Sequence, residues 1–215
     1  MVDEYQQALT VFTRTPVLGR TKTRLARSLG EDAALAAHIE LVEGCLSRLQ
    51  LQADTRCVLS ITETASMANQ WAHQYQFELQ YQTEGDLGTR MYHSLCRMLR
   101  GSVVAAVLVG TDCPAIDSRY VYQAFAALTQ KDVVFGPAED GGYGLVGVRA
   151  CALPAACTLF EDIAWGGPDV MAISLERACQ AQLSVSQLPV IWDIDTVTDW
   201  QRYRRMVDVS CKTSD

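Results

Sequence analysis

The chain has 215 residues, of which 49% are hydrophobic and 20% charged, a composition typical of a globular domain. Its 18 basic and 25 acidic residues give a net charge of −7, which opposes non-specific binding to nucleic acid or to anionic lipid. We therefore expect one domain over residues 1–215 that has no nucleic-acid partner and that folds without disulfides or a structural metal.

The sequence gives no support for export or membrane insertion. Its longest uninterrupted apolar run covers residues 103–109, far fewer than the roughly 20 residues that cross a bilayer. The amino end, MVDEYQQ, lacks the basic flank and apolar stretch of a secretory signal, so we expect a cytoplasmic protein. The eight cysteines include no C-x-x-C pair, and we expect most of them to be reduced core residues.

Strands and helices are expected to alternate in the first half of the chain. The β-branched run at 8–13 predicts a strand that ends at the turn-forming Pro16 and Gly19. Apolar residues recur at steps of three and four over 31–50, which predicts an amphipathic helix. The next predicted elements are a strand at 56–61, a helix through Trp71, a strand at 77–81, and a helix opened by residues 85–86 with Leu87, Met91, Leu95 and Leu99 on one face.

The second half continues the same pattern. The apolar run at 103–109 predicts a buried strand, and a helix is expected at 118–128. Further strands are predicted at 132–135 and 188–192, followed by a helix at 197–207. Because the strands are continuously apolar and alternate with helices, we predict an α/β layer fold with a mainly parallel sheet.

Charged residues and glycines collect in four loops, each of which follows a predicted strand: 14–24, 111–114, 136–144 and 193–196. In open α/β sheets, ligands bind beyond the carboxyl ends of the strands. If the strands are parallel, the four loops share one edge of the sheet. Their convergence there is the main reason to expect a binding site.

The first of these loops is strongly basic. It carries Arg14, Arg20, Lys22 and Arg24, with Arg27 just beyond, and it also contains Gly19. Local positive charge beside a glycine suits a phosphate or pyrophosphate, although a solvated basic turn is an equally good interpretation of this loop alone. The loop is not a Walker A motif, because Thr21 stands where the second glycine of that motif belongs.

The second and third loops carry carboxylates. Asp112 directly follows a buried strand, where it could hold a divalent ion or simply cap the turn. In the third loop, glycines surround Glu139 and Asp140, which could bind a metal, bind hydroxyl groups or transfer a proton. The alternative for this loop is a tight hairpin with exposed acids.

The fourth loop places Asp193 and Asp195 on the same side of an extended segment. Like charges about 4 Å apart repel by roughly 4 kcal/mol at an effective dielectric constant near 20, so converging acids call for a cation. Carboxylate oxygens favour Mg²⁺ or Mn²⁺, with phosphates completing the coordination shell. Alternatively, Asp195 or Thr196 only caps the helix that begins at Val197. The histidines, at 38, 73 and 93, fall within predicted helices without metal-ligand spacing, and we expect structural or solvated roles for them.

Five segments carry a resemblance to a known family. They are FTRTPVLGRTKTRL (12–25), GDLGTRM (85–91), GTDCP (110–114), GPAEDGGY (136–143) and DIDT (193–196). In this order they resemble a bacterial glycosyltransferase-like family of the nucleotide-diphospho-sugar transferase (GT-A) superfamily, similar to 2-phospho-L-lactate guanylyltransferase and molybdenum cofactor guanylyltransferase. One departure is that the only Asp-x-Asp lies late, at 193–195, rather than in the middle of the chain.

The resemblance implies a GT-A-like three-layer α/β/α sandwich with a mainly parallel, mixed sheet. It implies that residues 136–143 line the acceptor side of the site. The implied roles are as follows: nucleotide binding by Arg14, Gly19, Lys22, Arg24, Gly85, Asp86 and Arg90; metal binding by Asp112, Asp193 and Asp195; and catalysis by Lys22, Asp112, Glu139 and Asp140.

Together, the residues and the resemblance predict a transferase that depends on Mg²⁺ or Mn²⁺. It would act on a nucleoside triphosphate or a nucleotide sugar, together with a small-molecule acceptor, by nucleotidyl or by glycosyl transfer. The alternative is a nucleotide-binding or interaction module that has lost catalysis. The sequence leaves a homodimer open.

Overall fold

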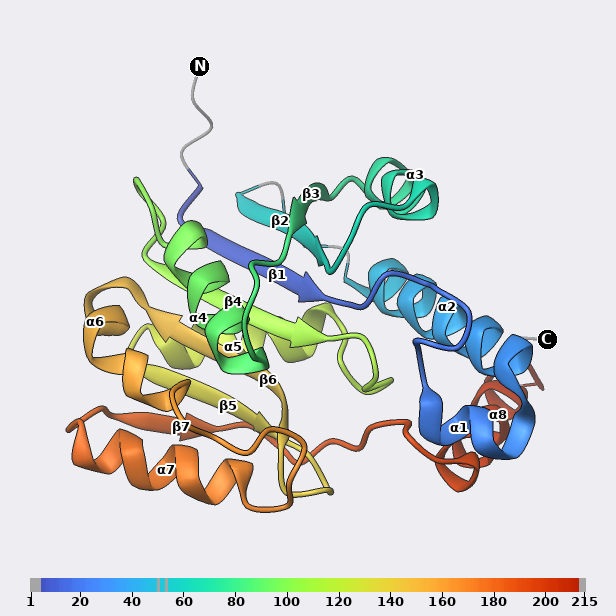
Figure 1. Ribbon diagram of the computed structural model, residues 1–215. Coiled ribbons are helices and arrows are strands. Elements are labelled where there is room, and N and C mark those ends of the chain that lie inside the picture. Colours follow the sequence, from blue (N-terminus) through green and yellow to red (C-terminus); the bar gives the residue numbers. More distant parts are fainter. Residues whose placement is uncertain (1–4, 50, 53, 213–215) are drawn as a thin grey trace.

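The computed structural model describes residues 5–49, 51–52 and 54–212 (Figure 1). Within these ranges, strands and helices alternate for most of the chain, as the sequence predicts. The strands are β1 (Gln7–Phe12), β2 (Thr55–Ile61), β3 (Glu78–Tyr81), β4 (Ala105–Gly110), β5 (Val133–Pro137), β6 (Tyr143–Arg149) and β7 (Val185–Gln187). The helices are α1 (Thr23–Leu29), α2 (Glu31–Arg48), α3 (Ser66–Tyr75), α4 (Leu87–Met98), α5 (Ser118–Leu128), α6 (Leu153–Ala156), α7 (Val170–Gln180) and α8 (Val197–Lys212), with short 3₁₀ turns η1 (Ala150–Ala152) and η2 (Cys157–Leu159).

All seven described strands belong to one sheet in the order β3-β2-β1-β4-β6-β5-β7. β1 lies between β2 and β4 and is parallel to both. β6 is antiparallel to its two neighbours, β4 and β5, so β5 again runs in the direction of β1 and β4. The sheet is therefore mixed but mainly parallel, and the carboxyl ends of β1, β4 and β5 lie along one edge.

Helices cover both faces of the sheet and complete a three-layer α/β/α sandwich (Figure 1). On one face, α2, α3 and α5 pack against alternate strand residues such as Leu9 and Val107. On the other face, α4, α6 and α7 pack against the intervening residues such as Ala8 and Ala106. The period of two along each strand sends successive side chains into opposite layers, which explains why these strands read as continuous apolar runs.

The helix predicted over 31–50 is α2, which ends at Arg48; the last residue of that prediction, Gln50, lies outside the described residues. Its first turn contains Glu31 and Asp32 and its last turn Arg48, an arrangement that complements the helix dipole. Its buried stripe, which includes Leu41 and Leu46, faces the sheet and the last helix.

Other predictions need correction. The strand expected at 188–192 is found earlier, as β7, and only Ile191 of the predicted segment forms an isolated bridge, with Ala138. Pro189 lacks the N–H that a ladder requires, which is consistent with the break. The sequence also did not indicate α1, α7 or β6; the amino end of β6 falls within the glycine-rich segment that was expected to be a loop.

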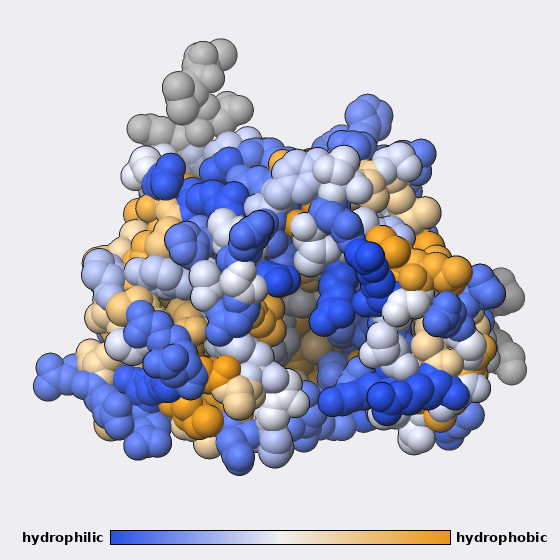
Figure 2. All heavy atoms as spheres, in the orientation of Figure 1, coloured by the Kyte–Doolittle hydropathy of each residue, from blue (hydrophilic) through white to orange (hydrophobic). Residues whose placement is uncertain are grey.

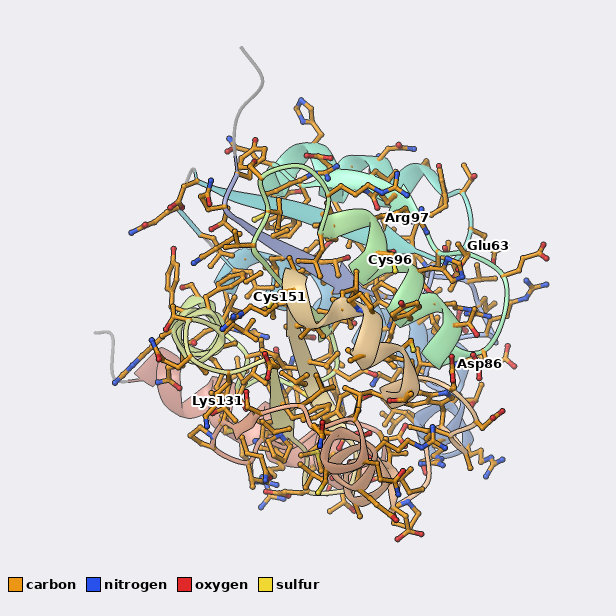
Figure 3. All side chains as sticks on the ribbon, turned by 90° about the vertical axis from the view of Figure 1, so that its left-hand side faces the viewer. Glu63, Asp86, Cys96, Arg97, Lys131 and Cys151 are labelled. Carbon is orange, nitrogen blue, oxygen red and sulfur yellow. The ribbon has the colours of Figure 1, made fainter. Side chains whose placement is uncertain are left out.

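The seven cysteines whose side chains are described are all free thiols, and Cys45 and Cys113 are the buried ones. Figure 3 shows Cys96 on α4 and Cys151 on the turn η1. Among the described residues, no helix is both long and apolar enough to cross a membrane.

Candidate active site

The four charged loops meet at one edge of the sheet, around a cleft of about 690 Å³. Each loop contributes residues to its lining, including Arg14, Asp112, Asp140 and Asp193. The cleft opens on the face shown in Figure 2, where strongly hydrophilic residues gather along its right-hand edge. The predicted convergence of the loops is thus what the fold produces.

The first loop is fixed at its beginning by the residues that follow β2 and by His38 of α2. Thr15 donates its backbone N–H to the hydroxyl of Thr62 and its own hydroxyl to the carbonyl of Glu63. The buried ring of His38, on α2, lies 3.0 Å from the carbonyl oxygen of Arg14. Because burial lowers the pKa of His38, the ring is neutral near pH 7, and its Nε2 can serve as the donor.

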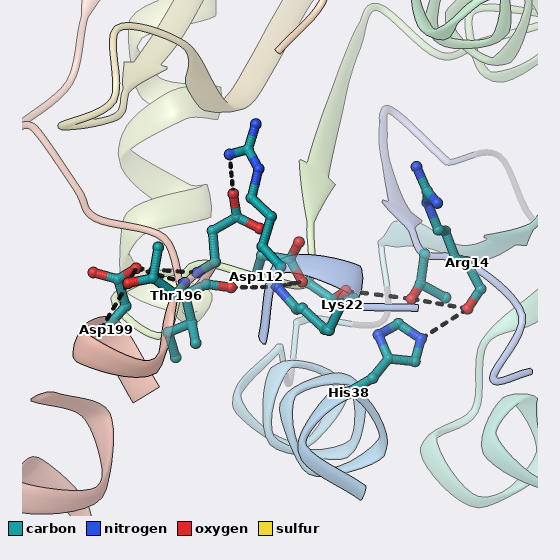
Figure 4. Close-up of polar contacts among 11 residues, drawn as sticks. Arg14, Lys22, His38, Asp112, Thr196 and Asp199 are labelled. Carbon is teal, nitrogen blue, oxygen red and sulfur yellow. Dashed lines mark hydrogen bonds and ion pairs between the residues drawn. The ribbon is translucent and has the colours of Figure 1, made fainter. Parts of the chain in front are cut away.

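Lys22 closes the first loop at the amino end of α1. It has a left-handed backbone (φ 48°, ψ 45°), a conformation that residues other than glycine rarely adopt and that often marks functional sites. Its Nζ lies 2.8 Å from Oδ1 of Asp112 and also donates to the carbonyl of Ile194 (Figure 4). Only 5% of the Lys22 side chain is exposed, so its charge is held inside the cleft.

Negative charge accumulates around this ammonium group. Burial, together with the nearby carboxylates of Asp140, Asp195 and Asp112, raises the pKa of Asp193 to about 6. Burial and the carboxylates of Asp112 and Asp193 also raise the pKa of the Cys113 thiol well above its usual range. Cys113 therefore stays protonated and is no candidate nucleophile.

The fourth loop joins the first through side chains. Arg24 forms an ion pair with Asp195, so Asp195 is not a free carboxylate. The helix cap that the sequence left open between Asp195 and Thr196 is made by Thr196, which exchanges hydrogen bonds with Asp199 as a capping box (Figure 4). The backbone N–H of Ile194 donates to the carbonyl of Asp112, which ties the second and fourth loops together.

The third loop separates its two acids. Asp140 lines the cleft, and its Oδ1 accepts the backbone N–H of Gly142 at 2.9 Å. Glu139 does not line the cleft: it forms a two-pronged ion pair with Arg202 of α8, at 2.9 and 3.2 Å. The loop joins two antiparallel strands, β5 and β6. It is therefore a hairpin, as in the alternative considered for this segment from the sequence.

The structure leaves three more predicted residues outside the cleft lining: Gly19, Gly85 and Asp86. Asp86 caps α4 by accepting the N–H of Thr89 at 2.8 Å, and Figure 3 shows it at the start of that helix. Hydrogen bonds from the hydroxyl and the backbone N–H of Thr89 lower the pKa of Asp86. Arg90 does line the cleft, and its Nε donates to the carbonyl of Gly85, which gives Gly85 a supporting position.

Several lining residues received no role from the sequence. Thr13 and Thr111 each follow a parallel strand directly, and that position was the signal available for them. The hydroxyl of Thr21 is buried in the lining and has no hydrogen-bond partner among the described residues. Trp165, brought in by the segment before α7, could not be placed from the sequence because nothing local ties it to the other loops.

These carboxylates fit a divalent ion that shares its coordination with a substrate. In the described part of the chain, no three His, Cys, Asp or Glu side chains form a complete cage. Mg²⁺, however, commonly takes one or two carboxylates and completes its shell with water and phosphates. Asp112 and Asp193 could supply two such carboxylates. Asp112 is paired with Lys22, just as Asp195 is paired with Arg24, so pairing alone does not set Asp195 apart.

Comparison with known proteins assigns the chain to a family. Residues 45–167 match the model of a bacterial family described as "Uncharacterized protein conserved in bacteria (DUF2064)". The chain belongs to the DUF2064 family. No curated protein shows a significant match.

Solved structures extend the comparison of this DUF2064 chain. It is 30% identical to a "putative nucleotide-diphospho-sugar transferase" from Desulfovibrio desulfuricans G20, with a TM-score of 0.81 over 91% of this chain and 85% of that one. The fold also resembles that of 4-diphosphocytidyl-2C-methyl-D-erythritol synthase from Anaerococcus prevotii (10% identity, TM-score 0.65, 96% and 98% covered). A third similar structure is molybdopterin-guanine dinucleotide biosynthesis protein A from Archaeoglobus fulgidus (15% identity, TM-score 0.54, 94% and 98% covered). The resemblance to the nucleotide-diphospho-sugar transferase superfamily is confirmed.

Proposed function

We propose that this protein is a metal-dependent transferase that acts on a nucleotide-activated substrate. The observation that carries the proposal is the buried Lys22 ammonium group, 2.8 Å from Asp112 at the carboxyl ends of β1 and β4. A cation and a carboxylate held together inside a cleft are suited to a ligand that carries both phosphates and a metal ion. The similarity to a nucleotide-diphospho-sugar transferase supports the same substrate class.

The basic side of the cleft would bind the phosphates. Arg14, Lys22 and Arg24 line it together with the unpartnered hydroxyl of Thr21. Lys22 and Arg24 would exchange their carboxylate partners for phosphate oxygens when the nucleotide binds. Thr21 would donate its hydroxyl to the same phosphates, which would satisfy a buried polar group.

The acidic side would hold the metal. Asp112 and Asp193 would be the protein ligands of Mg²⁺ or Mn²⁺, and the bound ion would offset negative charge on the phosphates. Release of Lys22 toward the phosphates would leave Asp112 available. Burial and, after it, repulsion from the neighbouring carboxylates raise the pKa of Asp193, and a bound cation would be favourable because it would offset that repulsion.

We favour nucleotidyl transfer as the reaction. An acceptor oxygen would attack the α-phosphorus of a nucleoside triphosphate, the bond from that phosphorus to the bridging oxygen would break, and pyrophosphate would leave. Four cationic side chains, Arg14, Lys22, Arg24 and Arg90, line the cleft, which suits three phosphates. Positioning and electrostatics would carry most of the catalysis.

Glycosyl transfer is the second candidate, and the position of Asp140 favours it. This carboxylate lines the cleft and could accept the proton of an acceptor hydroxyl, while the nucleoside diphosphate leaves from the sugar carbon. Glu139 cannot share this role from its position beside Arg202.

A thermal-shift panel tests the proposal and separates the two reactions. Nucleoside triphosphates, diphosphates and nucleotide sugars are each added with and without Mg²⁺ or Mn²⁺. A ligand at 100 times its Kd stabilises the folded protein by roughly 2.7 kcal/mol, so a metal-dependent rise in Tm is expected. A preference for triphosphates supports nucleotidyl transfer, and a preference for nucleotide sugars supports glycosyl transfer. Binding without turnover would favour a module that has lost catalysis, and a flat panel would overturn the proposal.

A further inference from the structure

One side of the cleft is apolar, in contrast to the basic side. We call this surface the apolar wall; its residues are Leu87 and Met91 of α4, Tyr143 of β6, Trp165 and Val170. Leu87 is 44% exposed, whereas Met91 and Val170 are only 4% and 5% exposed, so Leu87 and the partly exposed Tyr143 and Trp165 form most of the surface that a ligand can reach. An apolar surface of this kind inside a polar cleft indicates contact with an apolar part of a ligand.

Close backbone contacts hold the apolar wall in place. A Cβ atom on Gly88 would lie 2.0 Å from the carbonyl oxygen of Phe160, and one on Gly141 would lie 1.9 Å from that of Pro168. These two glycines therefore let the segment that carries Trp165 dock against both α4 and the β5–β6 hairpin. The ring of Trp165 packs edge-to-face against Tyr143, with centroids 6.3 Å apart, so neither ring turns freely.

The order of the strands gives the wall its place in the site. Thr62 and Gln82 follow β2 and β3 at one end of the cleft, where Gln82 donates to the carbonyls of Thr13 and Ser60. Lys22 and Asp112 occupy the middle, beyond β1 and β4. The apolar wall lies away from this polar end: its α4 residues cover β1 and β4, and Tyr143 extends it onto β6. Nucleobases present hydrogen-bonding edges, so the polar end suits the base, and the wall remains for the acceptor.

We propose that the apolar wall is the acceptor subsite and that the acceptor carries an alkyl or aromatic group next to its reacting oxygen. This inference rests on the proposed function, which places the phosphates at Lys22. The charged lining residues nearest to the wall in sequence are Arg90 of α4, whose Nε is bound to the carbonyl of Gly85, and Asp140 of the hairpin. The wall does contain two polar atoms, the hydroxyl of Tyr143 and the indole N–H of Trp165, but both are buried and are not exposed to the cleft. A sugar would therefore offer hydroxyl groups to the apolar atoms of the wall, whereas an apolar group would bury its surface there.

The test is a calorimetric titration with n-alkyl phosphates from ethyl to octyl, which measures the Kd of each. It is done once with the protein alone and once with Mn²⁺ and the nucleotide that raises Tm most. Each added methylene should lower Kd by about two- to fourfold until the wall is covered. Trp165→Ala should flatten this dependence and leave the affinity for the nucleotide and Mn²⁺ within about twofold. The matched control is Tyr81→Ala, which removes an exposed aromatic residue outside the cleft lining and should keep the full dependence.

The outcomes separate the two proposals. Affinity that does not change with chain length, or the same dependence in Trp165→Ala, would overturn the acceptor subsite even if nucleotides bind. A chain-length dependence that is lost in Trp165→Ala, in a protein that binds no nucleotide, would keep the apolar subsite and overturn the transferase proposal. Equal losses in Trp165→Ala and Tyr81→Ala would assign both effects to stability and would also reject the subsite.

Discussion

The buried ammonium group of Lys22 lies 2.8 Å from the carboxylate of Asp112, in the position where a bound cation would meet the same oxygen. If Asp112 is a metal ligand as proposed, Lys22 and the ion would compete for it when no nucleotide is present. With nucleotide bound, the phosphates would hold both Lys22 and the ion. The proposal therefore couples the affinity for the metal to the affinity for the nucleotide, and single substitutions can measure the two separately.

We expect Lys22→Met to have opposite effects on the two ligands. Without its competitor, Asp112 should bind Mn²⁺ more tightly in the nucleotide-free protein, while affinity for the triphosphate should fall by roughly tenfold or more because a charged hydrogen bond is lost. Affinity for the nucleoside should change little. Calorimetry with the three ligands measures each effect, and equal losses for nucleotide and nucleoside would reject a phosphate contact.

Asp112→Asn should weaken Mn²⁺-dependent nucleotide binding by about an order of magnitude or more, because an amide oxygen is a poorer ligand than a carboxylate. Nucleotide binding without metal should be affected less. The measurement is a titration with and without Mn²⁺. Unchanged affinity in the presence of Mn²⁺ would remove Asp112 from the metal site.

The two neighbouring acids of the third loop should differ in their effect on turnover. Asp140→Asn should lower kcat by roughly a hundredfold if Asp140 takes the acceptor proton. Glu139→Gln serves as the matched control, because that carboxylate is paired with Arg202 outside the cleft lining. Product formation under saturating nucleotide measures both. Equal losses in both variants would contradict the assignment.

Asp193 gives a pH-dependent prediction for the metal-free protein. Its pKa of about 6 lies above that of an unfolded aspartate, so the folded state binds the proton more tightly and loses stability as pH rises from about 4 to 6. Asp193→Asn should therefore be more stable above pH ~6, by on the order of 1 kcal/mol after allowance for solvent screening, and equal to the wild type near pH ~4. Thermal unfolding across this range tests it. A difference that is the same at both ends would mean that charge is not the cause.

Gly141→Ala should destabilise the fold more than Gly101→Ala. Both glycines have positive φ, at 89° and 66°, so both substitutions strain the backbone. A methyl group at Gly101 meets open space, whereas one at Gly141 would lie 1.9 Å from the carbonyl oxygen of Pro168. We expect the free energy of unfolding, measured with urea, to fall by about 1 kcal/mol in Gly101→Ala and by more than about 2 kcal/mol in Gly141→Ala. Similar losses of stability in the two variants would show that the segment that carries Trp165 can move away from Gly141 with little loss of free energy.

Local patterns carried most of the fold prediction. The apolar run before Asp112 could only be a buried strand, and the three-and-four spacing before Arg48 defined α2. β6 was missed because its glycine-rich beginning looks like a loop, and only its pairing with β4 and β5 makes it a strand. Tertiary pairing of this kind leaves no local signal.

Residues of the site could be predicted from the sequence where their place after a predicted strand brings them to the cleft. Asp112 and Asp140 closely follow the ends of β4 and β5. Lys22 lies at the end of the loop after β1, and Asp193 follows the isolated bridge at Ile191 rather than a strand. The structure brings all four to one cleft. The exclusion of Glu139 was not predictable, because it depends on Arg202, which lies 63 residues away in the chain. Adjacent residues in a turn point in different directions, and only the distant partner shows which one faces the ligand.

The contacts from Lys22 to Ile194 and from Arg24 to Asp195 join residues 172 and 171 positions apart. Closing so long a loop costs conformational entropy that only the assembled sheet can offset. During synthesis, the basic loop at 14–24 can therefore gain these contacts only after the last part of the chain has been made. Binding of a ligand in the cleft would thus report that residues 193–196 have joined the first loop. A chain that ended before residue 193 would contain all seven described strands of the sheet but would lack these contacts.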